Sequence, residues 1–162
     1  ITKKVKAKFL VVIPDEKLRA IVEKSFSKIE VEICVRNLAE SLLWADVAIA
    51  SSGTVTMECS YFQVPTVILY KTSFLTAFLG RLFIKVKCIG MPNILSGNRH
   101  VYPEFIQRNA TASNLSEAVL RFLIREDVRS QTKTDLQTMR ATLGGEGACQ
   151  RAAGKVLELF EK

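Results

Sequence analysis

Short apolar runs of strand length recur along the chain and alternate with segments of helical periodicity. The runs are nearly continuous and rich in β-branched residues, and they cover residues 9–13, 31–35, 47–50, 66–69 and, more weakly, 86–89. Strands that are apolar on both faces are typical of a parallel sheet covered by helices, because half-exposed antiparallel strands alternate apolar and polar residues. The chain is therefore predicted to be an α/β protein with a Rossmann-like, doubly wound parallel sheet.

Helical patterns fill the intervals between these runs, and they predict helices over residues 16–26, 38–44 and 54–62. Residues 113–162 contain no strand-like run and are predicted to form a helical tail. Its first helix has Ser113 and Asn114 as capping candidates, and the later helices cover residues 128–143 and 148–160. The 162 residues are thus expected to form a single domain that carries this tail.

Composition excludes several classes of protein. Apolar residues make up 48% and charged residues 24% of the chain, a balance typical of soluble globular proteins. The sequence contains no run of twenty apolar residues, so no segment is expected to span a bilayer, and the amino-terminal segment lacks the apolar region of a signal peptide. The four cysteines form no CxxC pair and there is one histidine, so we expect a reducing compartment, no metal site and no cofactor.

The net charge of +7 suggests an anionic partner, which can be nucleic acid, a phosphorylated ligand or an acidic membrane face. Residues 59–103 contain no Asp or Glu, yet they carry Lys71, Arg81, Lys85, Lys87 and Arg99. A solvated basic face is the alternative explanation. No aromatic-studded basic strand or recognition helix supports nucleic acid, so none is predicted as a partner.

The segment Ser51-Ser52-Gly53-Thr54 joins a predicted strand to a predicted helix. Ligands of open α/β sheets bind beyond the carboxyl ends of the strands, where helix amino termini present unpaired N–H groups and partial positive charge. Gly53 permits close backbone approach, and the hydroxyls of Ser52 and Thr54 add donors. The turn is predicted to bind a diphosphate, and an ordinary helix N-cap is the alternative.

Glu58 lies one helical turn after Thr54 on the same face of the predicted helix. A carboxylate beside a phosphate site would repel the ligand unless it serves another group. Accepting hydrogen bonds from a ribose diol is the role that suits it. The alternative is an acidic residue that stabilises the helix dipole.

A second polar loop, residues 90–107, follows the weak strand and opens on the same edge of the sheet. Asn93 can cap a short helix or offer its amide to a sugar or phosphate oxygen. Glu104 and Gln107 share one face of a turn if Pro103 starts a helix, and they are predicted to recognise hydroxyl groups. Lys71 can neutralise a phosphate or remain a solvated loop residue.

Residues 71–87 are amphipathic, with an apolar stripe whose members are Phe74, Leu75, Phe78, Leu79, Leu82 and Phe83. The stripe is either part of the core or, with the basic residues near its end, an interfacial surface over residues 74–87 that contacts anionic lipid.

Four segments in order, SSGTVTMEC, VPTVILYKTSFLTAFLGRLF, MPNILSGNRHVYPEFIQ and LGGEGACQRAAGKVLELF, resemble the carboxyl-terminal half of the lipid-A-disaccharide synthase family. The likeness covers residues 46–162 well and residues 8–45 more loosely. The resemblance implies half of a GT-B glycosyltransferase, whose active site lies between two Rossmann-like halves. It also implies a cytoplasmic protein, peripheral on the inner membrane.

The resemblance implies an inverting transfer of 2,3-diacylglucosamine from UDP to 2,3-diacylglucosamine 1-phosphate, so the donor or UDP is the expected ligand. By the family's motifs, Ser52, Gly53 and Thr54 match the diphosphate turn and Glu58 the ribose-binding acid. Asn93 matches the PN(I/L)LAG loop, and Glu104 with Gln107 match the PELLQ element. Ser96 stands where the family usually has Ala.

The family's glycine-serine-arginine loop, its first βα unit and its amino-terminal acceptor-binding half, with the proposed catalytic base, have no counterpart in this sequence. The chain alone is therefore expected to bind a UDP-sugar weakly and not to turn it over. Two other functions stay open at this stage. One is another GT-B enzyme acting on UDP-GlcNAc, and the other is a nonenzymatic nucleotide-binding α/β module.

Overall fold

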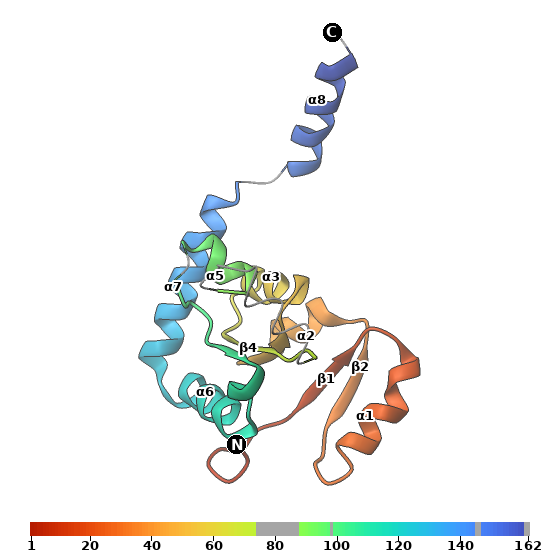
Figure 1. Ribbon diagram of the computed structural model, residues 1–162, viewed down its shortest axis with the longest axis vertical. Coiled ribbons are helices and arrows are strands. Elements are labelled where there is room, and N and C mark those ends of the chain that lie inside the picture. The colour runs from red at the N-terminus through yellow and green to blue at the C-terminus, as the bar shows by residue number, and fades with distance from the viewer. Residues whose placement is uncertain (74–87, 98, 145–146, 161–162) are drawn as a thin grey trace.

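The computed structural model describes residues 1–73, 88–97, 99–144 and 147–160, and its elements are labelled in Figure 1. The strands are β1 (Leu10–Ile13), β2 (Glu32–Val35), β3 (Ala48–Ser51), β4 (Thr66–Tyr70) and β5 (Glu104–Ile106). The helices are η1 (Glu16–Leu18), α1 (Arg19–Ser25), α2 (Leu38–Trp44), α3 (Thr54–Tyr61), α5 (Met91–Leu95), η2 (Gln107–Asn109), α6 (Ala112–Ile124), α7 (Glu126–Thr142) and α8 (Ala148–Phe160).

Every strand pair in the described part of the chain is parallel. β1 pairs with β2, and β3, β4 and β5 form a second sheet in that order. This confirms the predicted α/β class with helices between parallel strands. The predicted single sheet is divided, however, because no ladder joins β1 to β3 in the described residues, and Figure 1 shows β1 and β2 standing to one side.

The central strand β4 carries the core on both of its faces. Val67 packs with Val119 and Phe122 of α6, whereas its neighbour Ile68 packs with Tyr102 and with Leu136 of α7. Successive side chains of a strand point to opposite faces, so one strand anchors helices on both sides of the sheet. A separate cluster of Leu42, Cys59 and Val64 joins α2 to α3.

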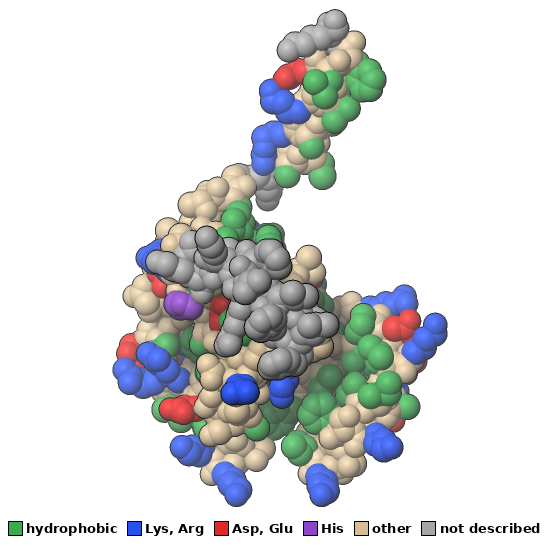
Figure 2. Space-filling view, viewed as in Figure 1, with side chains coloured by type: hydrophobic (Ala, Val, Ile, Leu, Met, Phe, Trp, Pro, Cys, Tyr) green, Lys and Arg blue, Asp and Glu red, His purple; other side chains and the backbone are tan. Residues whose placement is uncertain are grey.

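The helical tail differs along its length. Thr111 caps α6 by accepting a hydrogen bond from Asn114 N over 3.2 Å, so the helix starts before the capping candidates Ser113 and Asn114. α6 packs on β3 and β4, and α7 packs against α3, α5 and α6, but α8 has no buried residue. Figure 2 shows α8 projecting from the body with apolar side chains on one side and basic ones on the other. In the described residues no helix is long and apolar enough to cross a bilayer.

One local prediction was wrong. Pro103 precedes β5, and Glu104 pairs with Ile68 of β4 instead of starting a helix. Pro103 O also accepts a hydrogen bond from Ile68 N over 2.9 Å, so pairing with the central strand outweighs the local helical pattern. Of the weak strand expected over residues 86–89, the first two residues lie outside the described residues, and Cys88 and Ile89 are not in a strand.

Candidate functional site

The turn between β3 and α3 leaves the start of the helix open. Gly53 is the N-cap of α3, and no side chain caps the helix. Its backbone has φ 157° and ψ −166°, a region essentially restricted to glycine, and a Cβ placed there would meet no atom of the described residues within 4 Å. The first N–H groups of α3 therefore have no side-chain cap among the described residues, as an anion site requires.

Ser52 uses its hydroxyl within the protein. Its Oγ donates to Ile89 O over 3.1 Å, and its backbone N donates to Leu69 O over 3.2 Å. The side chain thus ties the β3–α3 turn to the segment that precedes α5. A phosphate oxygen would have to replace the Ile89 carbonyl as the acceptor of this hydroxyl proton.

Glu58 and Thr54 share the solvent-facing side of α3, as the sequence predicts. Thr56, Cys59 and Ser60 form the buried side of the helix. The Glu58 side chain is exposed, one turn from the open helix start, so its carboxylate is accessible to a ligand bound there.

Glu104 is a hydrogen-bonding centre between β5 and α5. Its carboxylate accepts hydrogen bonds from Ile89 N and Gly90 N over 2.9 Å each, and from Asn93 Nδ2 over 2.7 Å. Gly90 is needed for this close approach, because a Cβ there would lie 2.4 Å from Ile68 Cδ1 and 3.1 Å from Glu104 Oε1. Glu104 holds the loop before α5 against the sheet.

Asn93 is fully buried inside α5 and is not its cap, which is Gly90. Its Nδ2 donates to Tyr102 O and to Glu104 Oε1 over 2.7 Å each, and its Oδ1 accepts from Tyr102 N over 2.8 Å. An Asn amide has two N–H donors, so both are used inside the protein. In this arrangement Asn93 fixes the shape of the loop.

Lys71 and Gln107 follow the ends of β4 and β5. Lys71 is exposed, and the next residue, Thr72, donates its backbone N–H to Gln107 Oε1 over 3.4 Å. Gln107 has φ 51°, and its Nε2 is buried without a hydrogen-bond partner in the described part of the chain. Gln107 therefore carries both backbone strain and an unused donor.

The eight predicted residues fall into three groups on or near one edge of the sheet. β3, β4 and β5 end together, because Ser51 pairs with Leu69 and Tyr70 with Ile106. Ser52, Glu104 and Asn93 are linked through the Ile89–Gly90 segment, and Lys71 is linked to Gln107 through Thr72. Gly53, Thr54 and Glu58 form the open helix start.

Sequence reasoning missed Gly90, Tyr102 and Thr72. Gly90 contacts residues 22 or 14 positions away, and Tyr102 is held by Asn93 and by Val64 O, which accepts from its hydroxyl over 2.7 Å. Thr72 contributes through its backbone N–H, which carries no sequence signal. Only the fold brings these partners together.

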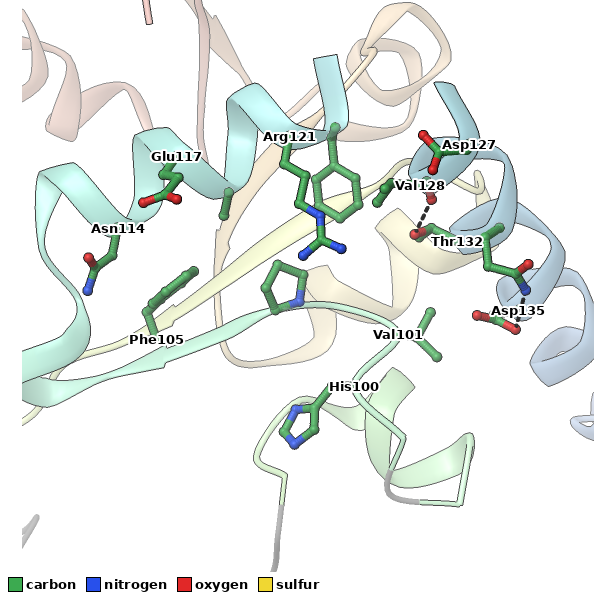
Figure 3. A pocket seen from close by; sticks show the side chains of 14 residues that line it. His100, Val101, Phe105, Asn114, Glu117, Arg121, Asp127, Val128, Thr132 and Asp135 are labelled. Carbon is green, nitrogen blue, oxygen red and sulfur yellow. Dashed lines mark hydrogen bonds between the residues drawn. The ribbon is translucent and has the colours of Figure 1, made fainter. Parts of the chain in front are cut away.

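A cavity of about 810 Å³ lies elsewhere, between β5, α6 and the first turns of α7. Figure 3 shows Arg121 reaching into it from α6, with Phe105 on β5 and His100 at its mouth. Phe105 faces this cavity, whereas the adjacent Glu104 faces α5, as the alternation of a strand requires. None of the eight predicted residues lines it.

Burial also decides the chemistry of two neighbouring groups. It raises the pKa of the Cys59 thiol and the pKa of the Tyr102 phenol, so both stay protonated near neutral pH. A protonated, buried thiol is a poor nucleophile, which makes Cys59 a packing residue.

Comparison with known proteins points to the same family. A family model described as lipid-A-disaccharide synthetase matches residues 2–159. A lipid-A-disaccharide synthase of Synechocystis sp. is 42% identical over 116 residues, which are 70% of this chain and 29% of that protein. The lipid-A-disaccharide synthase of Geobacter sulfurreducens is 36% identical over 136 residues, which are 84% of this chain and 35% of that protein. The lipid-A-disaccharide synthase of Myxococcus xanthus is 39% identical over 116 residues, which are 72% of this chain and 30% of that protein. The chain thus spans about a third of the length of these curated relatives.

Proposed function

The chain belongs to the lipid-A-disaccharide synthase family, and on that basis we propose that it is the donor-binding part of an inverting glycosyltransferase. Its ligand is a UDP-linked 2,3-diacylglucosamine. The open start of α3 binds the diphosphate, Glu58 binds the ribose, and Lys71 and Gln107 extend the site along the sheet edge.

One observation supports this proposal most directly. The N-terminal amides of α3 have no side-chain cap in the described residues, and Gly53 itself adds no side chain at this turn. Backbone N–H groups and the helix dipole together favour an anion at such a position. The exposed carboxylate of Glu58, one turn away, is then available to accept hydrogen bonds from hydroxyl groups.

Ser52, Asn93 and Glu104 are proposed to support the same site mainly by holding its loop in place. They fix the Ile89–Gly90 segment beside the β3–α3 turn through the hydrogen bonds described above. Pre-organised donors cost less to order when a ligand binds. We therefore assign these three residues to holding the loop, with direct ligand contacts secondary.

The proposed reaction transfers the diacylglucosamine unit to 2,3-diacylglucosamine 1-phosphate, forms a β-1,6 linkage and releases UDP. Such a transfer needs a base at the acceptor hydroxyl and stabilisation of the leaving diphosphate. The proposed site supplies only the stabilisation of the leaving diphosphate. Residues 1–162 by themselves are thus proposed to bind the donor without turning it over.

The partners follow from the same proposal. The base and the acceptor site belong to an amino-terminal acceptor domain of the family, and the work takes place in the cytoplasm at the inner membrane. The amphipathic residues 74–87 are the proposed contact with anionic lipid, and they lie outside the described residues. No cofactor and no nucleic acid is invoked.

The test is a titration of the 162-residue chain with UDP. Saturation-transfer NMR detects the contact, calorimetry measures the affinity, and inorganic phosphate is the reference ligand. We expect UDP to bind more tightly than phosphate. Glu58→Ala should weaken UDP binding about tenfold and should affect dUDP, which lacks one ribose hydroxyl, less. Glu117→Ala removes an exposed carboxylate of α6 and is the matched control. Absence of any contact with UDP, or equal binding of phosphate, contradicts the proposal.

A further inference from the structure

Gln107 has a backbone conformation that is uncommon for a residue with a side chain. Its φ of 51° lies in the left-handed region, which costs a residue with a Cβ about 1 kcal/mol or more. It opens the short helix η2 directly after β5. Strain of this kind persists where the surrounding structure needs the side chain in one particular place.

The carboxamide of Gln107 has a defined orientation. Thr72 N–H is a donor, so the atom that faces it over 3.4 Å is the carbonyl oxygen Oε1. The amide nitrogen Nε2 then points the other way. Nε2 is buried and has no hydrogen-bond partner in the described residues. An unpaired buried donor costs about 1–3 kcal/mol, so a bound acceptor would recover that loss.

The sheet order places this donor relative to the helix start. β3, β4 and β5 are neighbours, and adjacent strands lie about 4.8 Å apart. Gln107 therefore lies roughly 10 Å along the edge from the β3–α3 turn, with Lys71 after β4 between them. If the diphosphate of the donor occupies the turn, the glycosyl unit attached to the diphosphate can extend along the edge to Gln107.

We propose that Gln107 is a specificity-determining residue whose Nε2–H donates to an acceptor oxygen of the glycosyl unit of the donor. This inference rests on the proposed function. It adds which part of the ligand Gln107 contacts, the glycosyl unit, and that Gln107 is the donor in this hydrogen bond. The hydrogen bond from Thr72 N to Oε1 fixes the amide, so that Nε2 is the atom left for an acceptor of the ligand. The same bond couples the loop that carries Lys71 to recognition of the sugar.

Two variants test the contact. Gln107→Glu keeps the length of the side chain and an acceptor for Thr72 N, but a carboxylate has no hydrogen to donate. Gln107→Gly removes the amide and also relieves the left-handed strain. The matched control is Gln63→Gly, because Gln63 has φ 57° and its Oε1 accepts from Gln137 Nε2 over 3.0 Å, away from the sheet edge.

The probes are UDP and UDP-N-acetylglucosamine, a soluble sugar nucleotide without the acyl chains, titrated against the full 162-residue chain. The wild type should bind the sugar nucleotide more tightly than UDP. Both Gln107 variants should lower affinity for the sugar nucleotide at least tenfold and change UDP affinity less than twofold. The melting temperature of Gln107→Gly should not fall, and Gln63→Gly should leave both affinities unchanged.

Equal losses for the two ligands, unchanged affinities, or a wild type without preference for the sugar nucleotide overturn the inference about Gln107. If Gln107→Gly does not fold, Gln107→Glu decides. A wild type that binds neither ligand contradicts the proposed function itself. Binding of both ligands with no effect of Gln107 removes only the further inference.

Discussion

Asn93 and Tyr102 exchange two hydrogen bonds between the side chain of one and the backbone of the other. Asn93 Nδ2 donates to Tyr102 O over 2.7 Å, and Tyr102 N donates to Asn93 Oδ1 over 2.8 Å. Both residues are fully buried, so the amide imitates a strand partner for a backbone that would otherwise be unpaired. This contact closes the loop from α5 to β5.

Replacing Asn93 by Ala should destabilise the protein. The change leaves the buried N–H and C=O of Tyr102 without partners and removes one donor from Glu104, a loss of about 3 kcal/mol. Urea denaturation measures it, and the exposed Asn109→Ala is the control. Unchanged stability together with lost UDP-sugar binding would instead make Asn93 a direct ligand contact.

Gly90→Ala should also destabilise the fold, because the new methyl group would collide with Ile68 Cδ1 and crowd Glu104 Oε1. Overpacking of this kind costs about 1–3 kcal/mol. Thermal unfolding is the readout. Gly154→Ala in α8, where a Cβ meets nothing within 4 Å, should leave the melting temperature unchanged or slightly higher. The prediction fails if the two variants behave alike.

Gly53→Ala should weaken ligand binding more than it weakens the fold. A Cβ has open space there, so the cost comes from the backbone conformation and from a methyl group placed before the helix amides. Gly144→Ala is matched, because Gly144 also has a positive φ, 82°, and a Cβ there makes only ordinary contacts. We expect similar melting temperatures but loss of UDP binding, by calorimetry, for Gly53→Ala alone.

Tyr102 should make stability depend on pH in alkaline solution. Burial raises the pKa of its phenol above the ordinary value of about 10. The folded state then holds this proton more tightly than the unfolded state, so the contribution is full below about pH 10 and is lost as the pH rises above it. Tyr102→Phe should lower stability by about 1 kcal/mol at pH 7 and reduce the alkaline slope. Tyr70→Phe, at an exposed position, should leave that slope intact when urea midpoints are compared at pH 8 and pH 11.

Much of the fold follows from local patterns. The β-branched runs locate β1 to β4, and the predicted helix over residues 38–44 coincides with α2. β5 escapes this reading because its three residues carry a charged side chain and follow a proline, so their strand form depends on pairing with β4. The division into two sheets likewise depends on pairing between distant segments.

The candidate site divides in the same way. The positions of the β3–α3 turn and of Glu58 could be predicted from the sequence, because a strand, a glycine and a helix start are local features. Their place in the structure agrees with the prediction. Their role in binding stays a prediction. The hydrogen-bonding tasks of Ser52, Asn93 and Glu104 were not readable, since each depends on a partner brought near only by folding.

The sequence alone determined the α/β class, the order of most elements, the open helix start and the family, because hydrophobic periodicity, glycine and motif spacing act over a few residues. Tertiary structure alone decided which polar groups are already satisfied and which remain unused. The carboxylate of Glu104 has its donors, whereas the amide donor Nε2 of Gln107 has no acceptor in the described residues, although the two residues stand three positions apart. Burial and partners are set by contacts across the whole chain, and no short stretch of sequence records them.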